Sequence, residues 1–313
     1  MNAVSQRAGT LALPLLLVLT VAAALAGMAA TGALVPAQLV PASPLVTWGL
    51  PAVRALHHLG LLLAIGAGGT AVLLLPGPGR REVTTLDPLR RRTVRLGAAG
   101  ALLWAVASLA LIPLGGLEAT GAGTDLSVWR IALAGELGRI QLGITVLAGL
   151  SALAYALARS TVLACWGLAF AGLGAASLGL AGHAGSSLDH INAVNAMSVH
   201  LVAVSVWAGG LLVLFLLGGR MDEAQAVTAV RRFSPWALAS VIALALSGLL
   251  SAWIRLSGWS DLLTTGYGRV VLAKALGLTA LAVIGALQRR RLGDRIRFRH
   301  LAVTEGLVVA VVI

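Results

Sequence analysis

The chain contains eight apolar stretches that are each long enough to cross a lipid bilayer, and this feature limits its fold more than any other. They lie at about 11–35, 51–75, 96–117, 136–158, 161–181, 196–217, 236–256 and 268–287. A spanning helix needs roughly 20 apolar residues, and it satisfies its own backbone polar groups inside hydrocarbon. We therefore predict an all-α fold, a polytopic transmembrane helix bundle. A ninth apolar stretch begins at Leu301 and is cut off at Ile313, so we expect the chain to be part of a longer protein.

The composition excludes a soluble domain and most polyanionic partners. The chain is 58% hydrophobic and 11% charged, which leaves too few polar residues to cover its apolar surface. Its net charge of +12 comes from arginines in short connections between apolar stretches. That pattern is typical of a membrane protein, so the expected partner is the bilayer and no nucleic acid. No nucleotide-binding loop or hydrolytic motif is present, and no enzymatic activity is expected.

The arginines also predict an orientation. One set of connections carries Arg7, Arg80, Arg81, Arg90, Arg91, Arg92, Arg95, Arg159, Arg220, Arg231, Arg232, Arg289, Arg290, Arg291, Arg295, Arg297 and Arg299. The opposite set carries only Arg54, Arg130, Arg139, Arg255 and Arg269. Because basic connections stay on the cytoplasmic side, we predict a cytoplasmic amino terminus.

The second to fourth segments resemble the sixth to eighth in the same orientation, which predicts a parallel internal repeat. His57-His58 opens a helix that reaches Ala67-Gly68-Gly69, and His200 opens one that reaches Ala208-Gly209-Gly210. Later in each unit, a Gly-Arg pair opens a helix, at Arg139 and at Arg269. Parallel repeats are a known plan for transporters, with the functional site between the halves.

Five of the six histidines fall at the outer end of the predicted helices, and they are the candidate metal ligands. They are His57, His58, His183, His190 and His200. Histidine is costly beside hydrocarbon and is a common metal ligand. Met197 precedes His200 by three residues and shares its helical face. Imidazole suits copper or zinc, and a thioether adds a preference for Cu(I). Because Cys165 is the single cysteine, a thiolate-pair copper site is excluded.

Other readings of these residues stay open. A lone histidine at an interface is often only a hydrogen-bonded helix end. His58 and His200 are also candidates for the axial ligands of a b-type haem in an electron-transfer protein. Arg139 and Arg269 would then pair with its propionates. Lys274 lies about one turn inside the eighth segment, where a charge is a functional candidate or reaches back to the surface.

Several motifs resemble the copper resistance D family of bacterial inner-membrane proteins. They are Gly182-His183-Ala184, His200 followed by Trp207-Ala208-Gly209-Gly210, Tyr267-Gly268-Arg269 continuing to Lys274, and Gln288-Arg289-Arg290-Arg291. The resemblance implies a copper-handling protein of the cytoplasmic membrane that moves copper inwards. It also implies functional positions at His183, His200, Trp207 and Lys274. Some relatives carry a carboxylate where this chain has Met197, which would either shift the site towards Cu(I) or mean that the ligand set differs.

The resemblance also suggests how the chain is divided. We expect a first helix and outer loop at 1–50, a first repeat at 51–160, a copper resistance D-like region at 161–300 and the start of a further helix at 301–313. The cut-off ninth helix is similar to a longer actinobacterial type joined to a cytochrome oxidase copper-assembly domain. Copper delivery to an oxidase is therefore an alternative function, with that domain or a periplasmic copper carrier as partner.

Overall fold

The computed structural model describes Ala22 and residues 44–76, 86–120, 126–181 and 190–290, and all regular structure in these ranges is helical. The α-helices are α2 (Leu50–Gly69), α3 (Pro88–Thr120), α4 (Leu126–Ala134), α5 (Glu136–Leu157), α6 (Thr161–Ser177), α7 (His190–Gly218), α8 (Glu223–Arg255), α9 (Asp261–Thr264) and α10 (Gly266–Arg290). The shorter elements are η1 (Leu45–Gly49), η2 (Thr70–Leu74) and η3 (Leu178–Ala181). The predicted all-α class is confirmed.

Among the described residues, six helices are long and apolar enough to cross a membrane. They are Leu45–Leu74, Pro88–Ala119, Glu136–Leu157, Thr161–Ala181, Ile191–Gly218 and Glu223–Arg255. These match the second to seventh predicted segments. The eighth predicted segment forms α10, which is not among the six. The predicted first and ninth segments lie outside the described residues, so the full count of spans stays a prediction.

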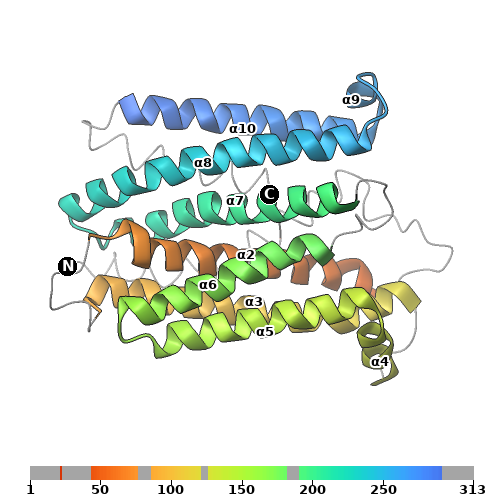
Figure 1. Ribbon diagram of the computed structural model, residues 1–313, viewed down its shortest axis with the longest axis horizontal. Helices are drawn as coiled ribbons and strands as arrows, with labels where there is room; N and C mark the ends of the chain where they lie inside the picture. Colours follow the sequence, from red (N-terminus) through yellow and green to blue (C-terminus); the bar gives the residue numbers. More distant parts are fainter. Residues whose placement is uncertain (1–21, 23–43, 77–85, 121–125, 182–189, 291–313) are drawn as a thin grey trace.

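The long helices lie side by side along the long axis of the molecule, with α2 in the middle (Figure 1). α2 packs against α3, α6 and α7, while α8 covers α7 and α10 packs on α8. Burial follows this order: 72% of the apolar window of α2 is buried, against 22% in α5 and in α8. The central position of α2 explains why it carries few exposed side chains.

The peripheral helices expose continuous apolar stripes. On α5 the stripe is Leu142, Val146, Leu150, Leu153 and Leu157, and on α8 it is Leu238, Ile242, Leu246, Leu249 and Trp253. Both stripes have the same helical spacing, so each covers one face of its helix. Apolar faces of this length suit lipid rather than water. The chain is therefore a multi-pass membrane protein.

Glycines allow α2 to approach two neighbours at backbone distance. A Cβ at Gly60 would meet the backbone of Trp104 and the carbonyl oxygen of Gly100 on α3. A Cβ at Gly209 of α7 would meet the carbonyl oxygen of Leu62 and the backbone of Gly66 on α2. Small residues at crossings let membrane helices pack by close backbone contact. Gly209 of α7 therefore packs directly on Gly66 of α2.

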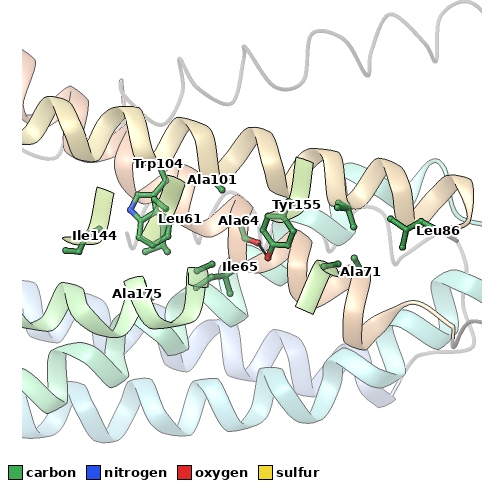
Figure 2. Packing of buried hydrophobic residues seen from close by; sticks show 14 residues of the cluster. Leu61, Ala64, Ile65, Ala71, Leu86, Ala101, Trp104, Ile144, Tyr155 and Ala175 are labelled. Carbon is green, nitrogen blue, oxygen red and sulfur yellow. Dashed lines mark hydrogen bonds between the residues drawn. The ribbon is translucent and has the colours of Figure 1, made fainter. Parts of the chain in front are cut away.

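Tyr155 of α5 joins several helices at the centre of the largest core cluster. Its ring is 1% exposed, and its hydroxyl donates a hydrogen bond to the carbonyl oxygen of Ala64 at 3.1 Å. Figure 2 shows the hydroxyl directed at Ala64, with Trp104 and Leu61 further along the same core. Gly68 and Gly167 leave the space that the ring and hydroxyl occupy. α5 is thus fixed to α2 and α6 through one side chain.

Removing this hydroxyl is expected to have a small destabilising effect. Tyr155→Phe keeps the ring but loses one hydrogen bond, which is worth about 0.5–1.5 kcal/mol. The thermal unfolding midpoint in detergent should fall by a few degrees at most. Tyr267→Phe is the matched control, because its hydroxyl is exposed and makes a weaker contact of 3.3 Å with Ser251. Equal midpoints for the two variants would contradict a bridging role for Tyr155.

The ends of several helices differ from the prediction. The basic residues Arg90–Arg95 and Arg231–Arg232 were expected in connecting loops, but they lie inside α3 and α8. α7 likewise begins at His190, before the start of the apolar segment predicted at 196–217. Apolar windows mark the hydrocarbon, whereas a helix continues as long as good helix formers such as arginine follow. α8 begins at Glu223, where Asp222 and Gln225 form a capping box that fixes the start of the helix.

Candidate functional site

α2 and α7 begin at the same end of the bundle, which we call the histidine end because it carries His57, His58 and His200. Figure 1 places the short helices α4 and α9 at this end as well. His190 is the first residue of α7, and the structure describes its backbone only. His183 lies outside the described residues. The structure thus places His57 and His58 on α2 and His200 on α7, and their gathering into one site stays a prediction.

His57 is buried, and its ring is held by Trp104. The Trp104 indole Nε1–H donates to His57 Nε2 at 3.0 Å, and the His57 side chain is 2% exposed. An indole nitrogen can only donate, so Nε2 must be the acceptor and Nδ1 of the neutral ring carries the proton. Nδ1 is buried without a hydrogen-bond partner among the described residues. While this bond holds, neither ring nitrogen of His57 has a free lone pair for a metal.

His58 has the opposite arrangement. Its Nδ1 lies 2.7 Å from the backbone carbonyl oxygen of Arg54, one turn earlier on α2. A carbonyl only accepts, so Nδ1–H donates and Nε2 keeps a lone pair. Metal-binding histidines are commonly oriented in this way. Arg54 itself forms an ion pair with Glu118 at the end of α3, with 3.2 Å between Nη2 and Oε2. The ring of His58 lies 5.2 Å from that of His57, measured between centroids.

His200 of α7 is oriented by a serine on α8. Its Nδ1 lies 3.0 Å from the Ser247 hydroxyl oxygen, which in turn donates to the carbonyl oxygen of Leu244 at 3.2 Å. A hydroxyl has one proton, so both contacts are hydrogen bonds only if His200 Nδ1–H donates to Ser247. His200 Nε2 then keeps its lone pair. Ser247 is 4% exposed, so this orientation is set inside the helix packing.

The contacts of His57 and His200 follow one pattern. Each histidine bonds to a residue 47 positions later, Trp104 on α3 and Ser247 on α8. Each also lies nine residues before the glycine at the α2–α7 crossing, Gly66 or Gly209. The residue four positions after each partner, Ser108 or Ser251, accepts a hydrogen bond at its carbonyl from the next long helix. These equal spacings support the predicted internal repeat, which stays a prediction.

These spacings also indicate which histidine of the first repeat unit corresponds to His200. The sequence alignment of Ala67-Gly68-Gly69 with Ala208-Gly209-Gly210 related His200 most directly to His58. The contacts instead relate it to His57, because Gly66 rather than Gly68 meets Gly209. Nine residues are two and a half helical turns, so His57 and His200 point away from the crossing and towards α3 and α8. The haem alternative, which needs His58 and His200 to face each other, gains no support from these contacts and stays a prediction.

Among the described residues, no group of three His, Cys, Asp or Glu side chains could hold a metal ion. A metal bound at His200 would therefore need other ligand types or residues from outside this set. Met197 is half-buried on α7, one turn before His200, and its thioether is a ligand of another type. His183 and His190 are the remaining predicted ligands.

The other predicted functional residues have different surroundings. Trp207 is 9% exposed and packs in a core cluster with Leu74 and Phe233. Lys274 is exposed on α10 and close enough to His200 for the two to interact electrostatically. Arg139 and Arg269 are exposed, and neither is in the two recorded ion pairs of the described residues, Arg54–Glu118 and Arg90–Asp87.

Sequence reasoning missed Trp104 and Ser247, the residues that orient the two histidines. Both lie in apolar helices, where a tryptophan or serine is normally assigned a packing role. The equal separation of 47 residues from His57 and His200 is the signal that could have indicated them.

Comparison with known proteins gives the family. The model of the family described as copper resistance protein D matches residues 227–313. The inner membrane protein YebZ of Escherichia coli (strain K12) is 31% identical over 259 residues, which cover 79% of this chain and 85% of YebZ. The chain belongs to the copper resistance protein D family.

Within this family, the chain is also similar to the copper transport protein CutJ of Bacillus subtilis (strain 168). The two are 37% identical over 93 residues, 28% of this chain. That match spans 17% of CutJ, so the activity of CutJ as a whole does not transfer. No solved structure matches the chain. The family assignment confirms the resemblance first indicated by the motifs around His200 and Lys274, and it makes this a copper-related membrane protein. The predicted division at residue 161 stays a prediction.

Proposed function

We propose that this protein binds copper at the histidine end and carries it across the bacterial cytoplasmic membrane. His200 is the central ligand, assisted by Met197 and by His183 and His190 from the start of α7 and the stretch before it. His58, on α2, offers a lone pair of its own apart from this site. Copper is the cargo of this site, and no enzymatic reaction is involved. The arginine distribution supports a cytoplasmic amino terminus, and hence an outward-facing histidine end.

The observation that carries this proposal is the hydrogen-bond chain from His200 through Ser247 to Leu244. It leaves the Nε2 lone pair of a half-buried imidazole available beside a thioether. Imidazole and thioether together suit Cu(I). The same availability at His58 follows from its bond to the Arg54 carbonyl.

The family name and the similarity to a protein named a copper transport protein support the same cargo.

Metal analysis of the purified protein tests the cargo. The full chain is expressed in copper-supplemented cells, purified in detergent, and analysed for copper and iron. Near-stoichiometric copper without iron supports the proposal. Iron at comparable levels, with the optical spectrum of a b-type haem, would favour the electron-transfer alternative. Copper that exchanges only with an added oxidase-assembly domain would favour the delivery alternative.

Replacing the central ligand is expected to reduce bound copper. His200→Ala removes the Nε2 donor, so the copper-to-protein ratio after dialysis should fall by at least half. His300→Ala is the matched control, since the sequence predicts His300 on the other side of the membrane. An unchanged ratio in His200→Ala, with normal elution in size-exclusion chromatography, would remove His200 from the site.

A further inference from the structure

Trp104 and Ser247 occupy corresponding positions, but they act on their histidines in opposite ways. Each lies 47 residues after its histidine, on the helix that follows it. The indole donates to Nε2 of His57, whereas the hydroxyl of Ser247 accepts from Nδ1 of His200. The first contact uses up the lone pair that a metal would need, and the second contact leaves it free.

We propose that Trp104 and Ser247 determine which of two equivalent histidine positions binds copper. In the second half, Ser247 is a positioning residue that fixes the proton of His200 on Nδ1 and directs Nε2 to the metal. In the first half, Trp104 closes the corresponding position at His57. This inference rests on the proposed copper function and adds to it the residues that select the site.

Packing makes the closed position stable. Trp104 is fully buried, and its ring fills the space beside Gly174 of α6, while Gly60 lets its backbone lie against α2. The indole cannot turn away from His57 without opening this packing. At His200 the partner is a hydroxyl on α8 that contacts Nδ1, so this bond does not use Nε2. The difference between the Trp104–His57 and Ser247–His200 contacts is therefore set by the fold and does not depend on bound copper.

The closed position keeps most of what a ligand site needs. His57 lies beside His58, whose Nε2 lone pair is available. His57 Nδ1 already carries the proton, so a metal could use Nε2 without any change of tautomer once the indole N–H is gone. Removing that single N–H should therefore create a second site formed by two adjacent imidazoles.

Copper titration of the full-length protein in detergent, with Cu(I) and a competing chelator, tests this proposal. Ser247→Ala should weaken copper binding about 10-fold, within the range known for lost outer-shell partners. Ser247→Thr, which keeps the hydroxyl, should bind as the wild type does. Trp104→Phe keeps a buried ring but removes the N–H, and it should bind one additional copper. Trp207→Phe is its control, because Trp207 is also a buried tryptophan and makes no recorded bond to a histidine.

The outcomes separate this inference from the proposed function. If the wild type binds copper and both Ser247→Ala and Trp104→Phe bind as it does, the selection by these residues is wrong and the copper function stands. If Ser247→Thr loses affinity as Ser247→Ala does, the hydroxyl is not the orienting group and the proposal fails. If the wild type binds no copper, both proposals fail together. Should Trp104→Phe not fold, the comparison of Ser247→Ala with Ser247→Thr decides alone.

Discussion

Gly209→Val is expected to destabilise the protein more than any other substitution considered. The new side chain would meet the carbonyl oxygen of Leu62 and the backbone of Gly66, closer than atoms can approach. These neighbours are backbone atoms of a central helix, so no side chain can rotate to make room. α2 and α7 would have to separate, and we expect a cost of about 3 kcal/mol.

The measurement is the midpoint of thermal unfolding in detergent, which should fall by several degrees. Gly149→Val is the matched control, since Gly149 lies mid-helix on α5 and a Cβ there would meet nothing within 4 Å. The control carries the same change in helix propensity without the clash. A Gly209→Val midpoint no lower than that of Gly149→Val would mean that α2 and α7 do not cross at these glycines.

Arg90→Met is expected to have the second largest effect, because Arg90 supplies hydrogen bonds that the backbone cannot make. Its side chain is 1% exposed; Nε donates to the carbonyl oxygen of Ala71 at 2.8 Å and Nη2 to that of Pro76 at 2.6 Å. η2 has the wide turn in which Leu75 N–H bonds to Thr70. The next carbonyl, that of Ala71, would need an N–H at Pro76, and proline has none.

Without the guanidinium, the carbonyl groups of Ala71 and Pro76 lose their donor, and Asp87 loses its ion-pair partner. We expect a loss of about 2 kcal/mol, since each of the two unsatisfied carbonyl groups costs at least about 1 kcal/mol. Arg92→Met is the control, because Arg92 lies on the same helix and is exposed. The two variants are compared by denaturation in increasing concentrations of a harsh detergent. Similar midpoints for Arg90→Met and Arg92→Met would show that the end of η2 needs no side-chain donor.

The sequence predicted the membrane helices well because hydrocarbon imposes a single strong requirement on them. Segments such as 136–158 and 161–181 match α5 and α6 within a few residues. The helix ends were less predictable, since Arg90 was expected in a loop and is buried in α3. Hydropathy marks the bilayer, but helix ends depend on caps and on tertiary partners, such as the carbonyls that receive Arg90.

The candidate site was predicted in part. The parallel course of α2 and α7, which carry His57, His58 and His200, followed from the order of the apolar segments, whereas a shared site for the three stays a prediction. The different roles of these histidines did not follow from that order, because a donor such as Trp104 lies 47 residues away in the chain and only folding brings it to the ring. Glycine and alanine are so frequent here that the repeat could be aligned in several registers, and the crossing at Gly66 was needed to choose one.

The contact between Gly66 and Gly209 also restricts how the two halves can move. Backbone lies on backbone there, so neither helix can slide past the other without climbing over a side chain. A relative motion that keeps this contact would be a rotation about it. A few degrees of opening at one membrane surface then closes the other surface by a comparable amount. Arg232 of α8, which donates to the Leu75 carbonyl beyond the crossing, spans the gap that such a rotation would widen.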